Sequence, residues 1–242
     1  AATRVARTWL LNDLEAAAWG VEAVAAADRL TLQAGEPERW GNQSVVAAGT
    51  GFGEAGRVWV DGWYRPFASE GGHADFAPAD ELDWSFQRWL HASHGHVSWD
   101  RIVSGPGIVA IHDFLRSERR VPAPPTLVEA MRAGDAAAAI AEAALAGRDA
   151  ICVEVLDRFL GYFGAEAGNH ALKLMATGGV FLAGGIAPKI LPRLADGPFL
   201  DAFRAKGRMA ELMRRMPVTV LCDGDVGLKG TALYGRRMAA GG

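Results

Sequence analysis

The chain has 242 residues, 50% hydrophobic and 22% charged, so it holds enough apolar material to bury a sizeable core. Its net charge of −3 provides no basic field, so neither nucleic acid nor a membrane surface is expected as a partner. The two cysteines, Cys152 and Cys222, are too few for a disulfide framework or a four-thiolate zinc site. They are typical of a reduced protein, which predicts a cytoplasmic location.

The first segment, to about residue 27, has apolar residues at helical spacing and predicts one or two helices after a strand-like Trp9-Leu10-Leu11. The first 20 residues contain neither an initiator Met nor an apolar core of signal-peptide length, so we expect the chain to be N-terminally truncated. β-Branched and aromatic content then predicts strands at 44–48 and 57–63, with the glycine-rich stretch 49–56 as the turn between them.

Helical patterns dominate from residue 81 onward. Helices are predicted at 81–93, 98–103, 106–118, 126–133, 135–146 and 148–175. Apolar strands follow at 179–182 and 217–222, each leading into a glycine-rich turn and a helix, the last of which ends near Met238. This order predicts an α/β fold with a helical insertion in the middle, and ligands gathered at the strand ends.

Asn12 and Asp13 stand where a predicted strand ends and a helix begins. An aspartate held there can act as a general base toward an alcohol that receives a phosphoryl group. A plain helix N-cap, in which either side chain accepts a backbone N–H, also explains the pair, and on this motif alone it is the favoured interpretation.

Two glycine-rich turns are candidates for nucleotide binding. In Gly49-Thr50-Gly51, backbone N–H groups and the threonine hydroxyl can approach phosphate oxygens, although many hairpins use such glycines only to turn. Gly184 and Gly185 open a later helix, where the absence of side chains can admit a base and ribose or simply allow a helix to pack on a sheet.

Polar residues for a small polyol occur in EGGHADFAP (70–78) and HVSWDRIVSGPGI (96–108). Glu70 and His73 flank a Gly-Gly pair, which turns a carboxylate and an imidazole toward one ligand. The alternative is a surface loop with solvated charges. A string as specific as EGGHADFAP makes that alternative the less favoured one. Asp100 is either a further sugar-facing carboxylate or one half of an exposed pair with Arg101.

The histidines at 91, 94 and 96 have a spacing that resembles a metal site. No helix or strand period aims all three at one point, however, so no metal site is expected there.

Six segments together, in order and spacing, closely resemble the bacterial glucokinase family of hexokinase-type sugar kinases. The resemblance covers nearly the whole chain, and it implies the actin-like ATPase fold, in which two α/β lobes enclose a cleft that binds glucose and ATP. The segments are LLNDLEAAA, AAGTGFGEA, EGGHADFAP, HVSWDRIVSGPG, GGVFLAGGIAPK and DVGLKGTAL.

By this resemblance the expected function is ATP-dependent phosphorylation of D-glucose to glucose 6-phosphate, with ATP and Mg²⁺ required and a homodimer as the assembly. Asp13 resembles the family's general base toward the sugar 6-hydroxyl, and Asn12, Glu70 and His73 resemble its glucose-binding residues. The turn from Gly49 to Gly51 resembles the second phosphate loop. Gly184 and Gly185 resemble the turn beside the adenosine.

The sequence departs from the family pattern at two places. Asp100 stands where the family usually has glutamate, one methylene longer, so we expect a sugar contact made through water or at longer range. The family's D-x-G-G-T string, which organises Mg²⁺ and the ATP phosphates, does not occur before Asn12. Its absence predicts turnover lowered by orders of magnitude, because phosphoryl transfer depends on positioning and charge stabilisation.

The expected domains are a remnant of the small lobe at 1–22, which lacks most of its N-terminal sheet, a large lobe with the helical insertion at 23–223, and a C-terminal helix returning to the small lobe at 224–242. Two alternatives stay open. One is a non-catalytic sugar-binding paralogue or regulator. The other is a kinase for another hexose, related to the ROK kinases, although their cysteine-rich zinc segment is absent.

Overall fold

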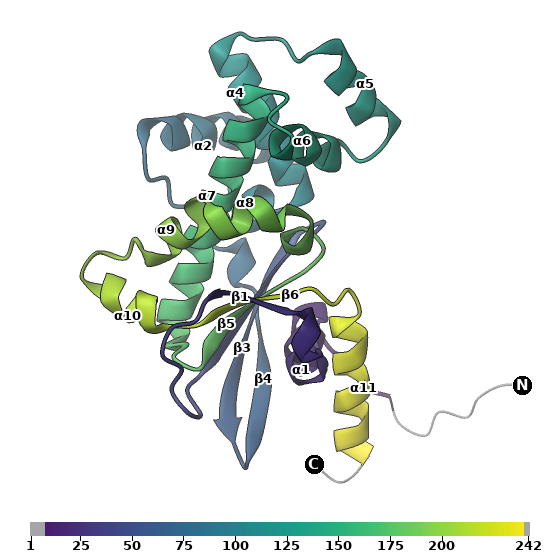
Figure 1. Ribbon diagram of the computed structural model, residues 1–242, viewed down its shortest axis with the longest axis vertical. Helices are drawn as coiled ribbons and strands as arrows, with labels where there is room; N and C mark the ends of the chain where they lie inside the picture. The colour runs from purple at the N-terminus through teal and green to yellow at the C-terminus, as the bar shows by residue number, and fades with distance from the viewer. Residues whose placement is uncertain (1–7, 240–242) are drawn as a thin grey trace, which may run out of the picture.

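A mixed β-sheet forms the middle of the computed structural model, which describes residues 8–239 (Figure 1). Six strands lie in the order β1-β6-β5-β2-β3-β4. The neighbours β2, β5 and β6 run parallel, whereas β1 joins β6, β3 joins β2 and β4 joins β3 in antiparallel fashion. The strands are β1 Arg29–Gln33, β2 Gln43–Ala48, β3 Phe52–Val60, β4 Trp63–Ser69, β5 Gly179–Ala183 and β6 Val218–Leu221.

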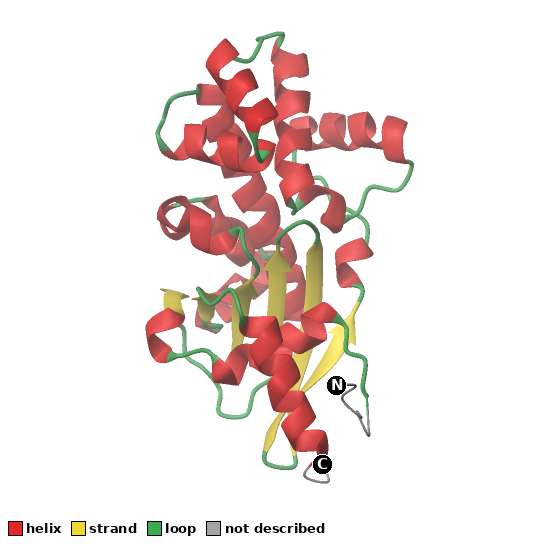
Figure 2. Ribbon diagram, turned by 90° about the vertical axis from the view of Figure 1, so that its right-hand side faces the viewer, coloured by secondary structure: helices red, strands yellow, loops and turns green. Residues whose placement is uncertain are grey.

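Helices cover both faces of the sheet (Figures 1 and 2). The long helix α7 (Ala150–Leu174) packs on one face, while α1 (Asp13–Gly20) and α11 (Val226–Ala239) pack together on the other. Successive residues of a strand point to opposite faces, so Val46 belongs to the α7 core whereas its neighbour Val45 packs with Ala18 of α1. This two-sided burial explains the continuous apolar run of β2 and its parallel neighbours.

A helical insertion between β4 and β5 rises above the sheet, at the top of Figure 1. Several of its helices begin at a side-chain cap, as at Asp80, Ser104, Asp135 and Asp149, each of which accepts a backbone N–H. Within residues 8–239, no helix is long and apolar enough to cross a membrane. The remaining helices are α2 Glu81–His94, α3 Trp99–Ile102, α4 Gly105–Arg119, α5 Pro125–Ala133, α6 Ala136–Leu145, α8 Leu191–Asp196, α9 Pro198–Arg204 and α10 Ala210–Arg215.

The helices predicted between residues 81 and 175, the strands at 44–48, 179–182 and 217–222, and the closing helix are confirmed within one or two residues at most ends. The predicted strand at Trp9-Leu10-Leu11 is wrong, because these residues form no regular element and Leu10 is 98% exposed. The strands β1 and β4 were not expected. Both lie at sheet edges with many exposed side chains. β1 (RLTLQ) alternates over only five residues, and β4 (WYRPFAS) contains a proline and shows no apolar alternation.

Candidate active site

Two neighbouring cavities open beside the carboxyl ends of the parallel strands β2 and β5, where ligands gather in open α/β sheets. The smaller has a volume of about 400 Å³ and the larger about 560 Å³. Gly49 and Thr50, in the turn after β2, line both cavities. The smaller cavity brings together every sugar-site residue expected from the sequence, namely Asn12, Asp13, Glu70, His73 and Asp100.

The start of α1 presents Asn12 and Asp13 to the smaller cavity. Asn12 is also the N-cap, since its Oδ1 accepts from Leu14 N at 2.9 Å and from Glu15 N at 3.3 Å. Oδ1 of Asp13 accepts from Leu14 N at 2.8 Å. The capping interpretation and the site interpretation therefore hold together: capping fixes the helix start, and Asp13 still lines the cavity.

Glu70 immediately precedes a single 3₁₀ turn, Gly71–His73, that follows β4, and His73 is the last residue of that turn. Glu70 Oε2 lies 3.8 Å from His73 Nε2, and both side chains are largely exposed toward the cavity mouth. His96 holds the turn from outside, because its Nε2 donates to the His73 carbonyl at 2.9 Å. His96, considered above for a metal, thus helps to hold the turn that carries His73.

The Gly-Gly pair lets this turn sit directly on β3. A Cβ on Gly71 would come within 1.9 Å of Glu54 Oε2, and a Cβ on Gly72 within 2.4 Å of the Phe52 carbonyl oxygen. Any larger residue would lift the turn from the strand. The close approach fixes where Glu70 and His73 stand relative to the start of β3.

Asp100, in the short helix α3, reaches across to the turn after β2. Its Oδ1 accepts from Phe52 N at 2.7 Å, and it would lie 2.7 Å from a Cβ on Gly51. The carboxylate therefore fixes the Gly49–Gly51 turn while also lining the smaller cavity. The pair with Arg101 considered from the sequence is not among the ion pairs of the described residues.

Replacing Asp100 with asparagine is expected to weaken glucose binding by roughly 10- to 100-fold with little change in the melting temperature. The amide oxygen can still accept from Phe52 N, but the charged acceptor facing the cavity is lost, which costs about 1.5–3 kcal/mol. Isothermal titration calorimetry with glucose measures the first effect and a thermal melt the second. Asp201→Asn, in α9 and outside both cavities, is the matched control, and equal affinities for the two variants would contradict the assignment.

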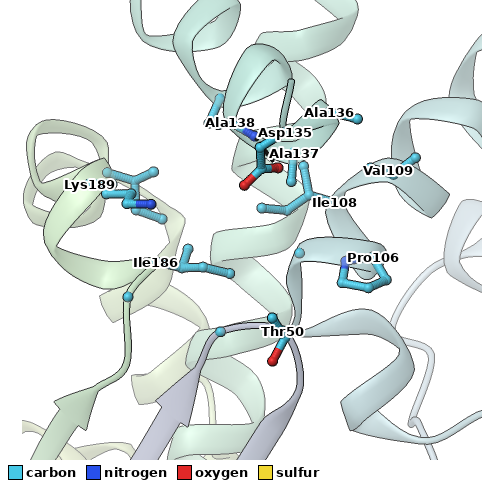
Figure 3. A pocket seen from close by; sticks show the side chains of 15 residues that line it. Thr50, Pro106, Ile108, Val109, Asp135, Ala136, Ala137, Ala138, Ile186 and Lys189 are labelled. Atoms are coloured by element: carbon cyan, nitrogen blue, oxygen red, sulfur yellow. Dashed lines mark hydrogen bonds between the residues drawn. The ribbon is translucent and has the colours of Figure 1, made fainter. Parts of the chain in front are cut away.

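The larger cavity lies between the helical insertion and the turn after β5 (Figure 3). Asp135 and Ile108 stand on one side of it, Ile186 faces them from the other, and Thr50 lies below. The lining is mainly apolar, which suits the flat face of a heterocyclic base. Only Gly49, Thr50 and Gly185 of its 15 lining residues were expected from the sequence. The rest include Gly105, Pro106, Val109, Ala136, Ala137, Ala138, Ala141, Lys189 and Ile190.

Backbone hydrogen bonds join the turn between the cavities, Gly49–Gly51, and the end of β2 before it to the start of α4 and to the turn after β5. Gly105 N, at the start of α4, donates to the Gly49 carbonyl at 2.8 Å. Ile186 N donates to the Ala48 carbonyl at 3.2 Å, which joins the turns after β5 and β2. Gly184 lines the smaller cavity and Gly185 the larger, so the two predicted nucleotide-turn glycines divide between them.

Three or more histidine, cysteine, aspartate or glutamate side chains do not gather into a metal-binding group anywhere in residues 8–239. His91 and His94 end α2, whereas His96 lies beyond it and contacts Asp75 and the His73 backbone.

Comparison with known proteins identifies glucokinases among the relatives of this chain. The sequence profile of a family described as Glucokinase matches residues 1–238. A glucokinase of Nostoc sp. is 41% identical over 242 residues, which cover 95% of this chain and 71% of that protein. The crystal structure of a glucokinase from an Antarctic psychrotroph superposes with a TM-score of 0.81 at 30% identity, over 94% of this chain and 68% of that one.

A more distant structure has the same fold. The ROK family glucokinase of Streptomyces griseus, solved in complex with glucose and AMPPNP, has a TM-score of 0.59 at 20% identity and covers 93% of this chain and 67% of that one.

Proposed function

Because the chain belongs to the glucokinase family, we propose that its two cavities divide the two substrates of ATP-dependent glucose phosphorylation, with glucose in the smaller and MgATP in the larger. The observation that carries the proposal is the shared wall: Gly49 and Thr50 line both cavities, so groups bound on either side meet at this turn. The product is glucose 6-phosphate.

In the smaller cavity, the acceptors and donors match a polyol. Glu70 and Asp100 accept hydrogen bonds from sugar hydroxyls, while the Asn12 amide and the His73 imidazole can donate. Asp13 is the general base. It takes the proton from the 6-hydroxyl as that oxygen bonds to the γ-phosphorus of ATP and the bond to the ADP oxygen breaks.

In the larger cavity, the adenine and ribose lie against the Gly185 turn and the apolar side chains of α4 and α6. The backbone N–H groups of Thr50 and Gly51 and the Thr50 hydroxyl are the donors for the phosphates, because Gly49 N already donates to the Gly51 carbonyl at 2.8 Å. Mg²⁺ enters as part of MgATP, where it neutralises phosphate charge. The AMPPNP and glucose bound together by the Streptomyces griseus enzyme support this pairing of ligands.

A hexose panel tests the proposal. Glucose is expected to bind in calorimetry more tightly than mannose or galactose, and a coupled assay is expected to yield glucose 6-phosphate with MgATP. The assay is run on the 242-residue chain and on a version preceded by the D-x-G-G-T segment of a relative, because the sequence contains no such string before Asn12. Failure to bind any hexose would reject the sugar site, and glucose binding with no product from either protein would favour the regulator alternative.

Three further expectations stay predictions of the sequence. They are the homodimer, the cytoplasmic location, and the domain boundaries at residues 22 and 223. Size-exclusion chromatography with light scattering would test the first.

A further inference from the structure

A buried polar cluster lies beneath the sugar-site turn, on the face of the sheet covered by α7. Glu54 of β3 is 1% exposed, and Glu166 and His170 of α7 are 0% and 3% exposed. None of them lines either cavity, so the phosphoryl transfer itself does not use them. Charged residues are almost never buried this fully without a partner, so the cluster requires an explanation.

Glu54 stands directly under Gly71. Glu54 pairs across the sheet with Ser69, the last residue of β4, and Glu54 Oε2 would be 1.9 Å from a Cβ on Gly71. The Ser69 hydroxyl in turn accepts from Gly71 N at 3.0 Å. The carboxyl group of Glu54 is therefore part of the surface on which the turn rests.

We propose that Glu54 is a positioning residue for the sugar site: its carboxyl group supports Gly71 and so fixes where Glu70 and His73 meet glucose. The inference rests on the proposed glucose site. Glu54 acts on the sugar only by supporting the turn Gly71–His73.

The state of the Glu54 carboxyl follows from its neighbours. Among the described residues, the Oε1 atoms of Glu54 and Glu166 are both buried without a hydrogen-bond partner, and the charge of Glu166 acts on the Glu54 carboxyl group. A proton on Glu54 removes the repulsion between the two carboxyl groups. Burial, followed by the charge of Glu166, raises the pKa of Glu54 to about 8.

The other polar groups of the cluster support this arrangement. Asn169 Nδ2 donates to Glu166 Oε2 at 2.8 Å, and Lys173 Nζ lies 3.6 Å from Glu166 Oε1, so an amide donor and a positive charge lie beside Glu166. Lys206, after α9, donates to Asn169 Oδ1 and completes that side.

On the other side of Glu54, His170 Nε2 lies 3.8 Å from its Oε2. His170 Nδ1 is hydrogen-bonded to Ser44 of β2 at 2.8 Å. Burial lowers the pKa of His170 to about 4, so the ring is neutral at pH 7 and offers Glu54 no positive charge.

The sign of the pH effect follows. The state that supports the turn holds the proton on Glu54, so glucose affinity is complete below a pH of about 8 and is lost as the pH rises through that value. Above it, two negative carboxylates would lie together out of water, which forces them apart and displaces Gly71.

The test measures glucose affinity by calorimetry from about pH 6.5 to about pH 9 for the whole 242-residue chain and three variants. The unaltered chain is expected to bind about tenfold more weakly at the upper end, since misplacing a binding group by even 1 Å is costly. Glu54→Gln keeps the shape without a titratable proton, so it is expected to bind glucose normally and to lose the pH dependence. Glu54→Ala is expected to bind about tenfold more weakly at every pH.

Glu166→Gln provides an independent readout, because it retains Glu54 and removes the neighbouring charge that helps raise its pKa. The loss of glucose affinity is then expected at lower pH than in the unaltered chain. Ser44→Ala is the matched structural control. It removes the bond to His170 on the far side of the cluster and is expected to leave both affinity and pH profile unchanged.

A purely structural role for Glu54 predicts different results. It would be indicated if Glu54→Ala bound glucose as tightly as the unaltered chain, or if Glu54→Gln kept the same pH dependence, and either outcome overturns the inference. If Glu54→Ala fails to fold, the pH dependence of glucose affinity in Glu54→Gln and Glu166→Gln still tests the inference. Absence of glucose binding by the unaltered chain at every pH would instead reject the proposed function.

Discussion

Replacing Asp13 with asparagine is expected to lower kcat for glucose phosphorylation by about 10²- to 10⁴-fold, the range for a missing general base. The amide cannot take the proton of the 6-hydroxyl, but it has nearly the same size and can still accept from Leu14 N, so helix α1 keeps its start. Glucose affinity is expected to change much less than kcat. A coupled assay for glucose 6-phosphate measures the first quantity, and calorimetry measures the second.

The matched control is Asp61→Asn, in the β3–β4 hairpin turn and outside both cavities. Both variants are made in the 242-residue chain and in the version that carries a relative's D-x-G-G-T segment. The kcat of Asp13→Asn is then compared with that of the control in each background. If Asp13→Asn retained the kcat of the control in the more active background, another group would have to accept the proton, and the role given to Asp13 would be wrong.

The residues that line the smaller cavity were predictable as a group because they occur in short, particular strings. Glu70 and His73 are three residues apart, and the Gly-Gly pair between them already indicated a tight turn. The structure places this turn in the same cavity as Asn12 and Asp13, which lie almost sixty residues earlier. Sequence patterns could name these residues, whereas their meeting at one cavity depends on the sheet order that sets β4 beside β3 and α1 across it.

The nucleotide side was less predictable because its lining is mostly ordinary. Ile108, Val109 and the alanines of α6 look like any helix surface, and they meet the Gly185 turn only through the packing of the insertion on the sheet. One local signal was available: Asp135 precedes an alanine-rich helix as an N-cap, and its side chain accepts from Ala138 N at 3.1 Å. Capping alone does not indicate a ligand, so only the tertiary structure shows that these residues line one cavity.

Glu54 shows a different limit. In the sequence it is one acidic residue in a glycine-rich strand, GFGEAG, where alternation would assign it to either face. Its burial beside Glu166 arises from α7, more than a hundred residues later. Long-range pairing of like charges leaves no pattern in either segment.

The crossing of α1 and α11 sets the position of Asn12 and Asp13, and it depends on two glycines. A Cβ on Gly230 of α11 would lie 1.8 Å from the Ala16 carbonyl oxygen and 2.5 Å from Gly20 N, both in α1. A Cβ on Gly20 would lie 1.9 Å from the Val226 carbonyl oxygen. These are backbone atoms, which cannot move aside by changing rotamer, so the helices must separate to accept any side chain here.

Gly230→Ala is therefore expected to lower the free energy of unfolding by about 2 kcal/mol or more, measured by urea denaturation. Alanine favours a helix over glycine by about 1 kcal/mol, but overpacking against rigid backbone typically costs 1–3 kcal/mol and more where nothing can yield. Because the separation also moves the start of α1, glucose affinity is expected to fall as well, although Gly230 lines neither substrate cavity.

Gly235→Ala is the matched control in the same helix, since a Cβ there meets nothing within 4 Å. It is expected to raise the free energy of unfolding by up to about 1 kcal/mol through helix propensity and to leave glucose affinity unchanged. Opposite signs for two identical substitutions five residues apart would isolate the helix crossing as the cause. Equal effects on stability and on glucose binding would mean that α1 and α11 do not approach this closely, and that the sugar site does not depend on their contact.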